Sequence, residues 1–130
     1  MIDSTVPVWV IDDCSLSAKL LERMIVSSGG EVTVFTKATE TASLANSGHW
    51  PLLILIDQQM PDLPGTTLCK RLRAAGYTGE LALMSASPEL IDENAVLGLR
   101  VDCMLRKPIE LLVVGMLIRR ARRLGRSAAA

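Results

Sequence analysis

The chain alternates five times between a short strand-like run and a helical pattern, and this alternation restricts its fold more than any other feature. The runs cover residues 6–11, 31–35, 52–56, 81–84 and 102–106. Residues 52–56 are apolar, too few for a typical helix and rich in branched residues, which indicates a buried strand. Residues 6–11 and 81–84 are also apolar, and the mixed runs 31–35 and 102–106 predict two further short strands. Strands alternating with helices predict an α/β fold, in which a parallel sheet carries helices on both faces.

The segments between and after these runs predict five helices. The first is expected between Ser15 and Gly29, and the second, third and fifth over residues 38–48, 68–76 and 109–123. Residues 87–98 predict the fourth, because Ser87, Pro88 and Glu89 form a typical helix start. Residues 111–118 are apolar almost all round the last helix, which favours cover on a second side by a partner, or an unusually apolar core helix.

Composition narrows the functional classes. With 130 residues and a net charge of zero, the chain is expected to form one domain that binds neither nucleic acid nor a membrane. The start of the chain lacks a signal-peptide pattern, and no apolar run reaches membrane-spanning length. Cys14, Cys69 and Cys103 are odd in number and contain no CxxC pair, so we expect reduced thiols and a cytoplasmic protein.

Polar residues follow four of the five predicted strands. Asp12 and Asp13 end the first, Asp57 the third, Ser85 the fourth and Lys107 the fifth. The carboxyl ends of parallel strands share one edge of a sheet, where open α/β folds bind ligands. Each residue alone would have an ordinary reading, such as a helix cap or a solvated charge, but together they predict a site at this edge.

The residue types at this edge indicate metal-assisted phosphoryl chemistry. Three crowded carboxylates are unfavourable unless a cation binds among them, and an all-oxygen ligand set favours magnesium. Lys107 and Ser85 can bind the oxygens of a phosphoryl group. Asp57 can then attack phosphorus and form an acyl phosphate.

Further residues complete a family pattern. Met60-Pro61 and Gly65 follow Asp57, while Ala86 follows Ser85 and Pro108 follows Lys107. From Val6 to about Arg120, the chain resembles the receiver domains of two-component response regulators, typified by the bacterial chemotaxis regulator. The resemblance implies a flavodoxin-like three-layer sandwich, with five helices and a five-stranded parallel sheet of order 2-1-3-4-5. Residues 1–123 would form this domain, and residues 124–130 a frayed helix end, a linker or a remnant of cloning.

The resemblance also implies a role for each site residue. Asp57 would accept a phosphoryl group from a histidine kinase or phosphotransfer protein, and Ser85 and Lys107 would hold the phosphoryl oxygens. The Lys107–Pro108 peptide is typically cis in this family. Such a domain catalyses its own phosphorylation and dephosphorylation, and we expect no turnover of an external substrate.

For the metal, the resemblance implies a magnesium ion held by acidic residues of the first and third strands. Asp12 or Asp13 would contribute together with Asp57, and the backbone carbonyl of Gln59 would be a further ligand.

The chain departs from the family pattern at two positions. One concerns the conformational switch, and the other concerns the lifetime of the phosphoryl group. Met104 stands where the family often has Tyr or Phe, the aromatic switch residue coupled to the hydroxyl of Ser85. Gln59 and Ser87, each two positions after a site residue, flank the expected path of the attacking water. We expect this pair to set the lifetime of the phosphoryl group.

Three other functions fit the sequence less well. The complete set of acids, hydroxyl and lysine argues against a degenerate receiver that acts only as an interaction scaffold, whereas Met104 in place of the aromatic residue argues for it. A phosphatase with an aspartyl nucleophile would need a DxDx[TV] pattern, which residues 11–15 lack. A flavin-binding protein would need a phosphate cradle in the first loop, where the acids would repel phosphate.

The expected output surface of the receiver consists of the fourth helix, fifth strand and fifth helix. It would bind a second copy, to form a homodimer, or an output domain.

Overall fold

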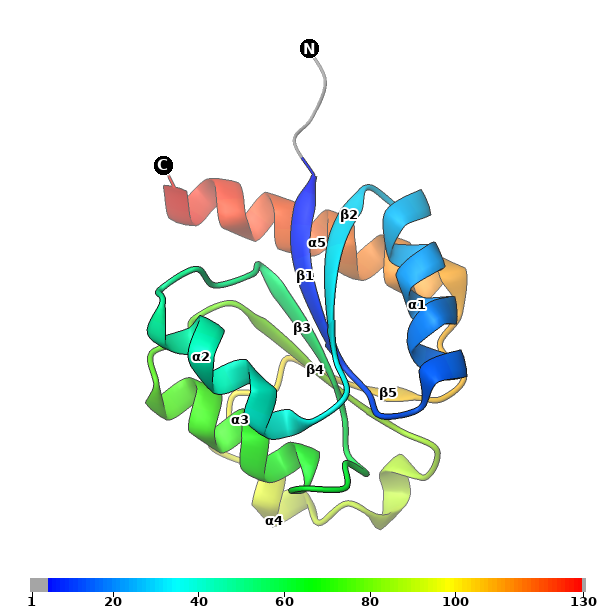
Figure 1. Ribbon diagram of the computed structural model, residues 1–130, viewed down its shortest axis with the longest axis vertical. Coiled ribbons are helices and arrows are strands. Elements are labelled where there is room, and N and C mark those ends of the chain that lie inside the picture. Colours follow the sequence, from blue (N-terminus) through cyan, green and yellow to red (C-terminus); the bar gives the residue numbers. More distant parts are fainter. Residues whose placement is uncertain (1–4, 130) are drawn as a thin grey trace.

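The computed structural model describes residues 5–129. Its sheet is parallel throughout and has the strand order β2-β1-β3-β4-β5, which confirms the predicted fold class (Figure 1). The strands are β1 (Val6–Ile11), β2 (Gly30–Phe35), β3 (Leu53–Asp57), β4 (Glu80–Ser85) and β5 (Cys103–Arg106). The helices are α1 (Ser15–Ser27), α2 (Thr41–Asn46), α3 (Gly65–Ala74), α4 (Glu93–Val96) and α5 (Leu111–Ala129), with 3-10 turns at Ala38–Glu40 and Pro88–Leu90.

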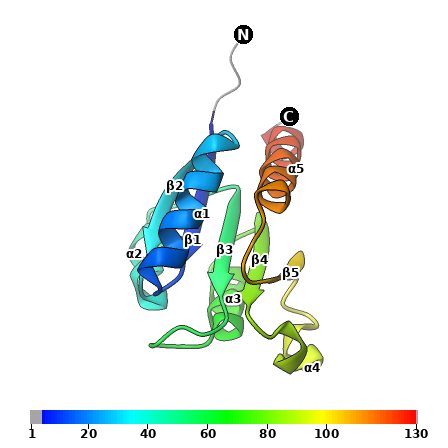
Figure 2. The ribbon, with the colours of Figure 1, turned by 90° about the vertical axis from the view of Figure 1, so that its right-hand side faces the viewer.

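Helices cover both faces of the sheet, and each face has its own apolar core (Figures 1 and 2). Successive strand residues point to opposite faces, so Val8 and Val10 pack toward α1 and α5, whereas Trp9 and Ile11 pack toward α3. All residues of β3 are buried, as expected for the central strand of a sheet covered on both faces.

The two cores differ in chemistry. The core under α1 and α5 is aliphatic, whereas the other contains a row of aromatic contacts. Ring centroids are 5.2 Å apart for Trp9 and Phe35, 5.8 Å for Trp9 and Trp50, and 5.1 Å for Trp50 and Tyr77. These four side chains are all the aromatic residues of the sequence, so the aromatic packing lies on one side of the sheet.

The predicted fourth helix is wrong in extent. Residues 87–98 form a 3-10 turn and then the single turn α4, because the backbone becomes extended at Ile91. Ser87 makes no side-chain cap. Instead the Asp92 side chain accepts the N–H of Asn94 at 2.9 Å, so the chain restarts as a helix at a second capping residue.

The last helix is longer than its pattern predicts. α5 extends to Ala129 rather than residue 123, which agrees with the helix-forming leucine, arginine and alanine residues in its final turns. The domain boundary at residue 123 stays a prediction. Val114, Leu117 and Ile118 lie in the core, while Leu112 and Met116 are exposed. Within residues 5–129, no helix combines the length and the apolar character needed to cross a bilayer.

Candidate functional site

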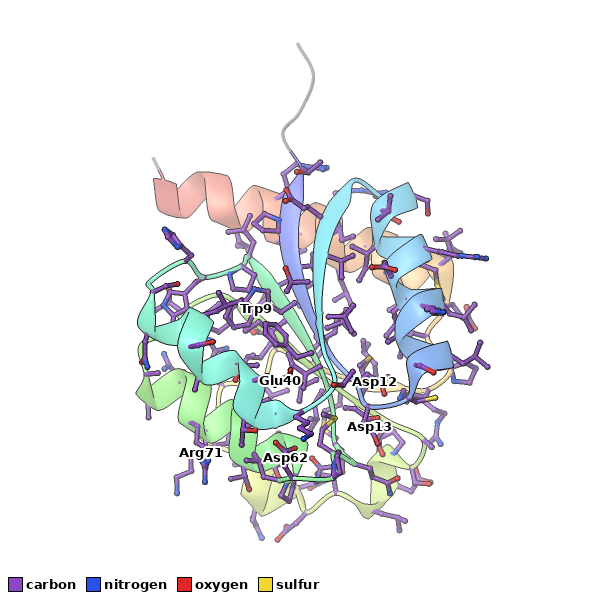
Figure 3. The ribbon with its side chains drawn as sticks, viewed as in Figure 1. Trp9, Asp12, Asp13, Glu40, Asp62 and Arg71 are labelled. Atoms are coloured by element: carbon purple, nitrogen blue, oxygen red, sulfur yellow. The ribbon has the colours of Figure 1, made fainter. Side chains whose placement is uncertain are left out.

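The pairing of β1 with β3 brings the first acidic residues together. Ile11 is the register partner of Ile56, so Asp12 and Asp57 follow side by side at the carboxyl edge of the sheet. Figure 3 shows Asp12 and Asp13 at the end of β1, where the chain turns toward α1. Asp12 is fully buried and Asp57 nearly so, whereas Asp13 is exposed.

Lys107 joins the two buried carboxylates. Its Nζ atom lies 2.8 Å from Oδ2 of Asp12 and 3.0 Å from Oδ2 of Asp57. The other oxygens accept backbone N–H groups, Oδ1 of Asp12 from Cys14 and Oδ1 of Asp57 from Gln59, both at 3.0 Å. Every oxygen of the two buried carboxylates therefore holds at least one hydrogen bond.

These contacts shift the three pKa values in different directions. Burial raises the pKa of Asp12, but the Lys107 hydrogen bond and the Cys14 N–H outweigh it and leave this pKa below its ordinary value. Burial raises the pKa of Asp57, and Lys107 offsets this only in part. Burial lowers the pKa of Lys107, but the hydrogen bonds to its two carboxylate partners outweigh this effect and leave the pKa above its ordinary value.

Three carboxylates at this edge lie close enough together to hold a metal ion. Asp12, Asp13 and Asp57 each offer a carboxylate oxygen, and these atoms all lie within 4.8 Å of one another. A carboxylate oxygen that accepts one hydrogen bond still has a free lone pair. The donor set is all oxygen, which fits a hard divalent cation such as magnesium. Gln59 stands two residues beyond Asp57 and lines the neighbouring cavity.

Ser85 lies at the end of β4 and is buried. Its Oγ atom accepts the N–H of Ser87 at 3.0 Å, and its carbonyl accepts the N–H of Lys107 at 2.9 Å. The Lys107–Pro108 peptide is cis. Met104, on the edge strand β5, is 38% exposed. The hydroxyl and the lysine thus meet at the same edge as the carboxylates, while the methionine lies at the surface.

A cavity of about 720 Å³ opens beside the carboxylates. Its wall includes Asp13, Gln59, Ser85, Ser87 and Asp92. The structure thus places Gln59 and Ser87, the two residues predicted to set the lifetime of the phosphoryl group, at the same opening. Asp92, which sequence reasoning treated as an ordinary helix residue, adds a further acidic side chain to this wall.

Sequence reasoning also missed Asp62, in the loop after β3. Its two carboxylate oxygens accept the N–H groups of Ala38 and Thr39 at 3.1 and 2.8 Å, so this loop is tied to the chain entering α2 (Figure 3). Its slight burial raises the pKa of Asp62, but these N–H groups lower it to about 2. An acid beside Pro61 in a loop is a general turn signal, and nothing in it specified a partner 24 positions away.

Comparison with known proteins agrees with this geometry. The family model described as "Response regulator receiver domain" matches residues 8–114. The chain therefore belongs to the receiver domain family of two-component response regulators.

Two regulators and one solved structure show the extent of the similarity. The transcriptional regulatory protein PcoR of Escherichia coli is 25% identical over 123 residues, 95% of this chain and 54% of PcoR. The DNA-binding transcriptional regulator NtrC of Proteus hauseri is 34% identical over 83 residues, 64% of this chain and 17% of NtrC. The chain thus spans about half of PcoR and a smaller share of NtrC. The receiver domain protein (CheY-like) from Methanospirillum hungatei JF-1 superposes with a TM-score of 0.84 at 18% identity, covering 96% of this chain and 99% of that one.

Proposed function

We propose that this domain is a signalling switch that accepts a phosphoryl group on Asp57 in the presence of magnesium. The carrying observation is the contact of Lys107 with both buried carboxylates, beside the exposed carboxylate of Asp13. Phosphoryl transfer to a carboxylate needs positive charge around the transferred group. A lysine on one side of Asp57 and a site for a hard cation on the other can supply it. Membership of the receiver family supports the same proposal.

The proposed step forms a bond between a carboxylate oxygen of Asp57 and phosphorus. The bond from phosphorus to the donor breaks, and the donor group leaves with that electron pair, as acetate from acetyl phosphate or as imidazole from phosphohistidine. An acyl phosphate remains on Asp57. Each oxygen of Asp57 accepts one hydrogen bond at rest, from Lys107 or from the Gln59 N–H, and keeps a second lone pair that can form the bond to phosphorus.

The other site residues have proposed roles that follow from their positions. Asp12 and Asp13 would hold magnesium together with Asp57, with the Gln59 carbonyl as a further ligand, and the bound ion would neutralise phosphoryl oxygens. Lys107 would exchange a carboxylate partner for a phosphoryl oxygen. The Ser85 hydroxyl, which accepts from Ser87 at rest, would donate to another phosphoryl oxygen.

The proposed phosphodonor is a histidine kinase or phosphotransfer protein in the cytoplasm. α1 and α5 both begin at the edge of the sheet that carries the site, since each follows the carboxyl end of a strand. Their first turns expose apolar side chains, with Leu16 69% exposed on α1 and Leu112 78% exposed on α5. Exposed apolar side chains beside a charged site are typical of a protein-docking surface.

Intact mass measurement tests the proposal. Wild type incubated with acetyl phosphate and magnesium should gain the mass of one phosphoryl group, and a chelator should abolish the gain. Asp57→Asn should show no gain, while Asp62→Asn, which changes an acid five positions away, should behave as wild type. An equal gain on Asp57→Asn would refute the assignment. No gain on wild type would favour the scaffold function.

A further inference from the structure

The chain between β4 and β5 is lightly packed. Across residues 86–102, no side chain whose burial the structure describes is fully buried. The side chains that pack partly against the core are Ile91, Leu99 and Val101. Leu90 and Leu97 are 82% and 73% exposed. Segments with few buried contacts have low local stability and open easily. The position of this segment therefore depends on how its two ends are attached.

The near end is attached at the functional site. The Ser87 N–H donates to Oγ of Ser85, the atom proposed to turn toward a phosphoryl group. Arg106 donates to the carbonyl of Ala86 at 3.2 Å and pairs with Glu89 at 2.7 Å, but this ion pair is exposed. A change at Ser85 therefore acts directly on this end.

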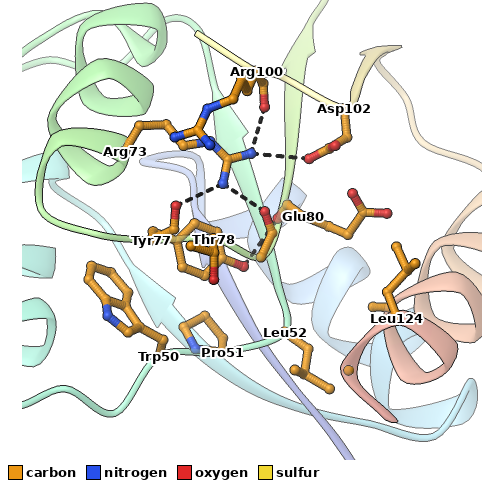
Figure 4. Close-up of a pocket in the computed structure, with 13 residues that line it drawn as sticks. Trp50, Pro51, Leu52, Arg73, Tyr77, Thr78, Glu80, Arg100, Asp102 and Leu124 are labelled. Atoms are coloured by element: carbon orange, nitrogen blue, oxygen red, sulfur yellow. Dashed lines mark hydrogen bonds and ion pairs between the residues drawn. The ribbon is translucent and has the colours of Figure 1, made fainter. Parts of the chain in front are cut away.

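The far end is attached by Arg73 of α3 (Figure 4). The side chain is only 10% exposed. Its guanidinium donates to the carbonyls of Tyr77, Gly79, Leu99 and Arg100, at 2.9, 2.8, 3.4 and 2.5 Å, and to Oδ2 of Asp102 at 3.2 Å. An arginine has five N–H donors in a rigid plane, and here these five contacts join the turn before β4 to the connection before β5.

Two details make this attachment specific. Arg100 has a φ of 54°, a left-handed conformation that is unfavourable for a residue with a side chain. Its carbonyl is held by Arg73 in that conformation. Oδ2 of Asp102 also accepts the N–H of Leu81 at 2.8 Å, which ties the same point to β4.

We propose that Arg73 is a positioning residue that fixes residues 98–102, so that a rearrangement starting at Ser85 stays within residues 86–97. The confinement rests on the proposed function, because phosphorylation supplies the change at Ser85. When the Ser85 hydroxyl turns to a phosphoryl oxygen, the hydrogen bond from the Ser87 N–H is lost, and the near end keeps only the exposed Arg106 contacts, while the buried Arg73 attachment remains. The part of the chain that rearranges then ends at the left-handed turn around Arg100.

Hydrogen–deuterium exchange by mass spectrometry tests the attachment without any phosphoryl chemistry. Arg73→Lys keeps the positive charge but loses the planar fork. In this variant, peptides covering 97–102 should exchange roughly tenfold faster or more, since several hydrogen bonds from a charged group are lost. Peptides covering β1 and β3 should be unchanged. Asp102→Asn, which keeps an acceptor for the Leu81 N–H, should give a smaller increase at the same place. Arg71→Ala, an exposed arginine of the same helix, should have no effect.

The second comparison adds magnesium and beryllofluoride, a phosphoryl mimic. In wild type, exchange should change over 86–97 and not over 98–102, whereas in Arg73→Lys the change should spread into 98–102. Unchanged exchange in Arg73→Lys, or an equal wild-type response in both segments, would overturn the inference while leaving the proposed function standing. A mimic that alters exchange nowhere in wild type would overturn the proposed function and the confinement together.

Discussion

Lys107 Nζ donates to Oδ2 of Asp12 across 2.8 Å, although the two residues are 95 positions apart in the chain. The contact is possible because β1 and β5 run parallel and their ends share one edge of the sheet. Asp12 is fully buried, so this lysine is its cationic partner in the part of the chain that the structure describes.

Replacing Lys107 by alanine should destabilise the domain by roughly 1–3 kcal/mol, because two mostly buried carboxylates lose their cationic partner. Magnesium should recover part of this loss by supplying positive charge. Urea unfolding with and without magnesium measures both effects. Lys19→Ala, at an exposed lysine of α1, is the control. A variant no less stable than this control would contradict the importance of the bridge.

Replacing Asp13 by alanine should reduce the stabilisation by magnesium while leaving the metal-free domain at least as stable as wild type, since an exposed carboxylate near two others contributes mainly repulsion. In wild type, magnesium at about ten times its dissociation constant should add about 1.4 kcal/mol of unfolding free energy. Asp13→Ala should show less than half of that at the same concentration. Thermal unfolding and calorimetry, with sodium chloride at matched ionic strength, provide the measurement.

Asp92→Asn is the matched control for the metal experiment, because Asp92 lines the same cavity but lies outside the acidic cluster. Asparagine keeps the capping oxygen that Asn94 uses. If magnesium affinity fell equally in both variants, the ion would not be located by the three-carboxylate cluster.

Arg120 should matter more than its neighbour Arg119. The Arg120 guanidinium pairs with Glu80, whose carboxyl is mostly buried, and burial followed by the nearby Asp102 raises the pKa of Glu80. Arg120→Ala should cost about 1–3 kcal/mol in urea unfolding, because Glu80 is left without its cation. Arg119→Ala, at an exposed position, should change the unfolding free energy by less than about 0.5 kcal/mol. Equal losses would show that the pair is not specific.

The Asp62 carboxylate should make stability depend on pH at the acid end. Its folded pKa of about 2 lies below the ordinary value of 3.8, so its contribution is complete above about pH 4 and is lost as pH falls toward 2. Asp62→Asn should flatten this part of the stability profile. At pH 7 it should cost about 1 kcal/mol or less, since the group is exposed and screened. Circular dichroism between pH 2 and 5 follows the effect, and an unchanged profile would contradict it.

The exposed face of α4, β5 and α5 should be the surface that pairs with a second copy after phosphorylation. It presents Leu97, Met104, Leu112 and Met116, while acidic Glu89 and Glu93 lie near α4 and basic Arg119 and Arg123 on α5. Beryllofluoride with magnesium should raise the mass measured by light scattering. Leu112→Glu should prevent the increase, whereas Leu16→Glu, on α1, should not. If the mass of wild type were the same with and without the mimic, this face would be excluded as a dimer surface.

The sheet and the meeting of the site residues could be predicted because they depend on a rule about strand ends. Asp12, Asp57, Ser85 and Lys107 each stand at the end of a predicted strand, and parallel strands place such positions at one edge whatever the loops do. The apolar runs are themselves a strong local signal, since a strand buried on both faces has to be apolar at every position.

The parts that could not be predicted depend on distant partners. Ser87 and Pro88 are a good local helix start, but residues 87–98 bury too little to sustain a helix, and Asp92 offers a competing cap. Arg73 looked like any charged residue of an amphipathic helix. Its five acceptors come from two separate loops, and no spacing in the sequence brings them together.

The one-sided row of aromatic rings determines what intrinsic fluorescence can observe. Trp9 and Trp50 both lie on the side of α2 and α3, and Trp50 contacts Tyr77, over whose ring Arg73 sits at 5.5 Å. Tryptophan emission should therefore respond to loosening at Arg73, whereas the aliphatic side under α1 and α5 has no chromophore of its own. If tryptophan emission and a backbone signal gave different denaturant midpoints of unfolding, the two faces of the sheet would differ in stability.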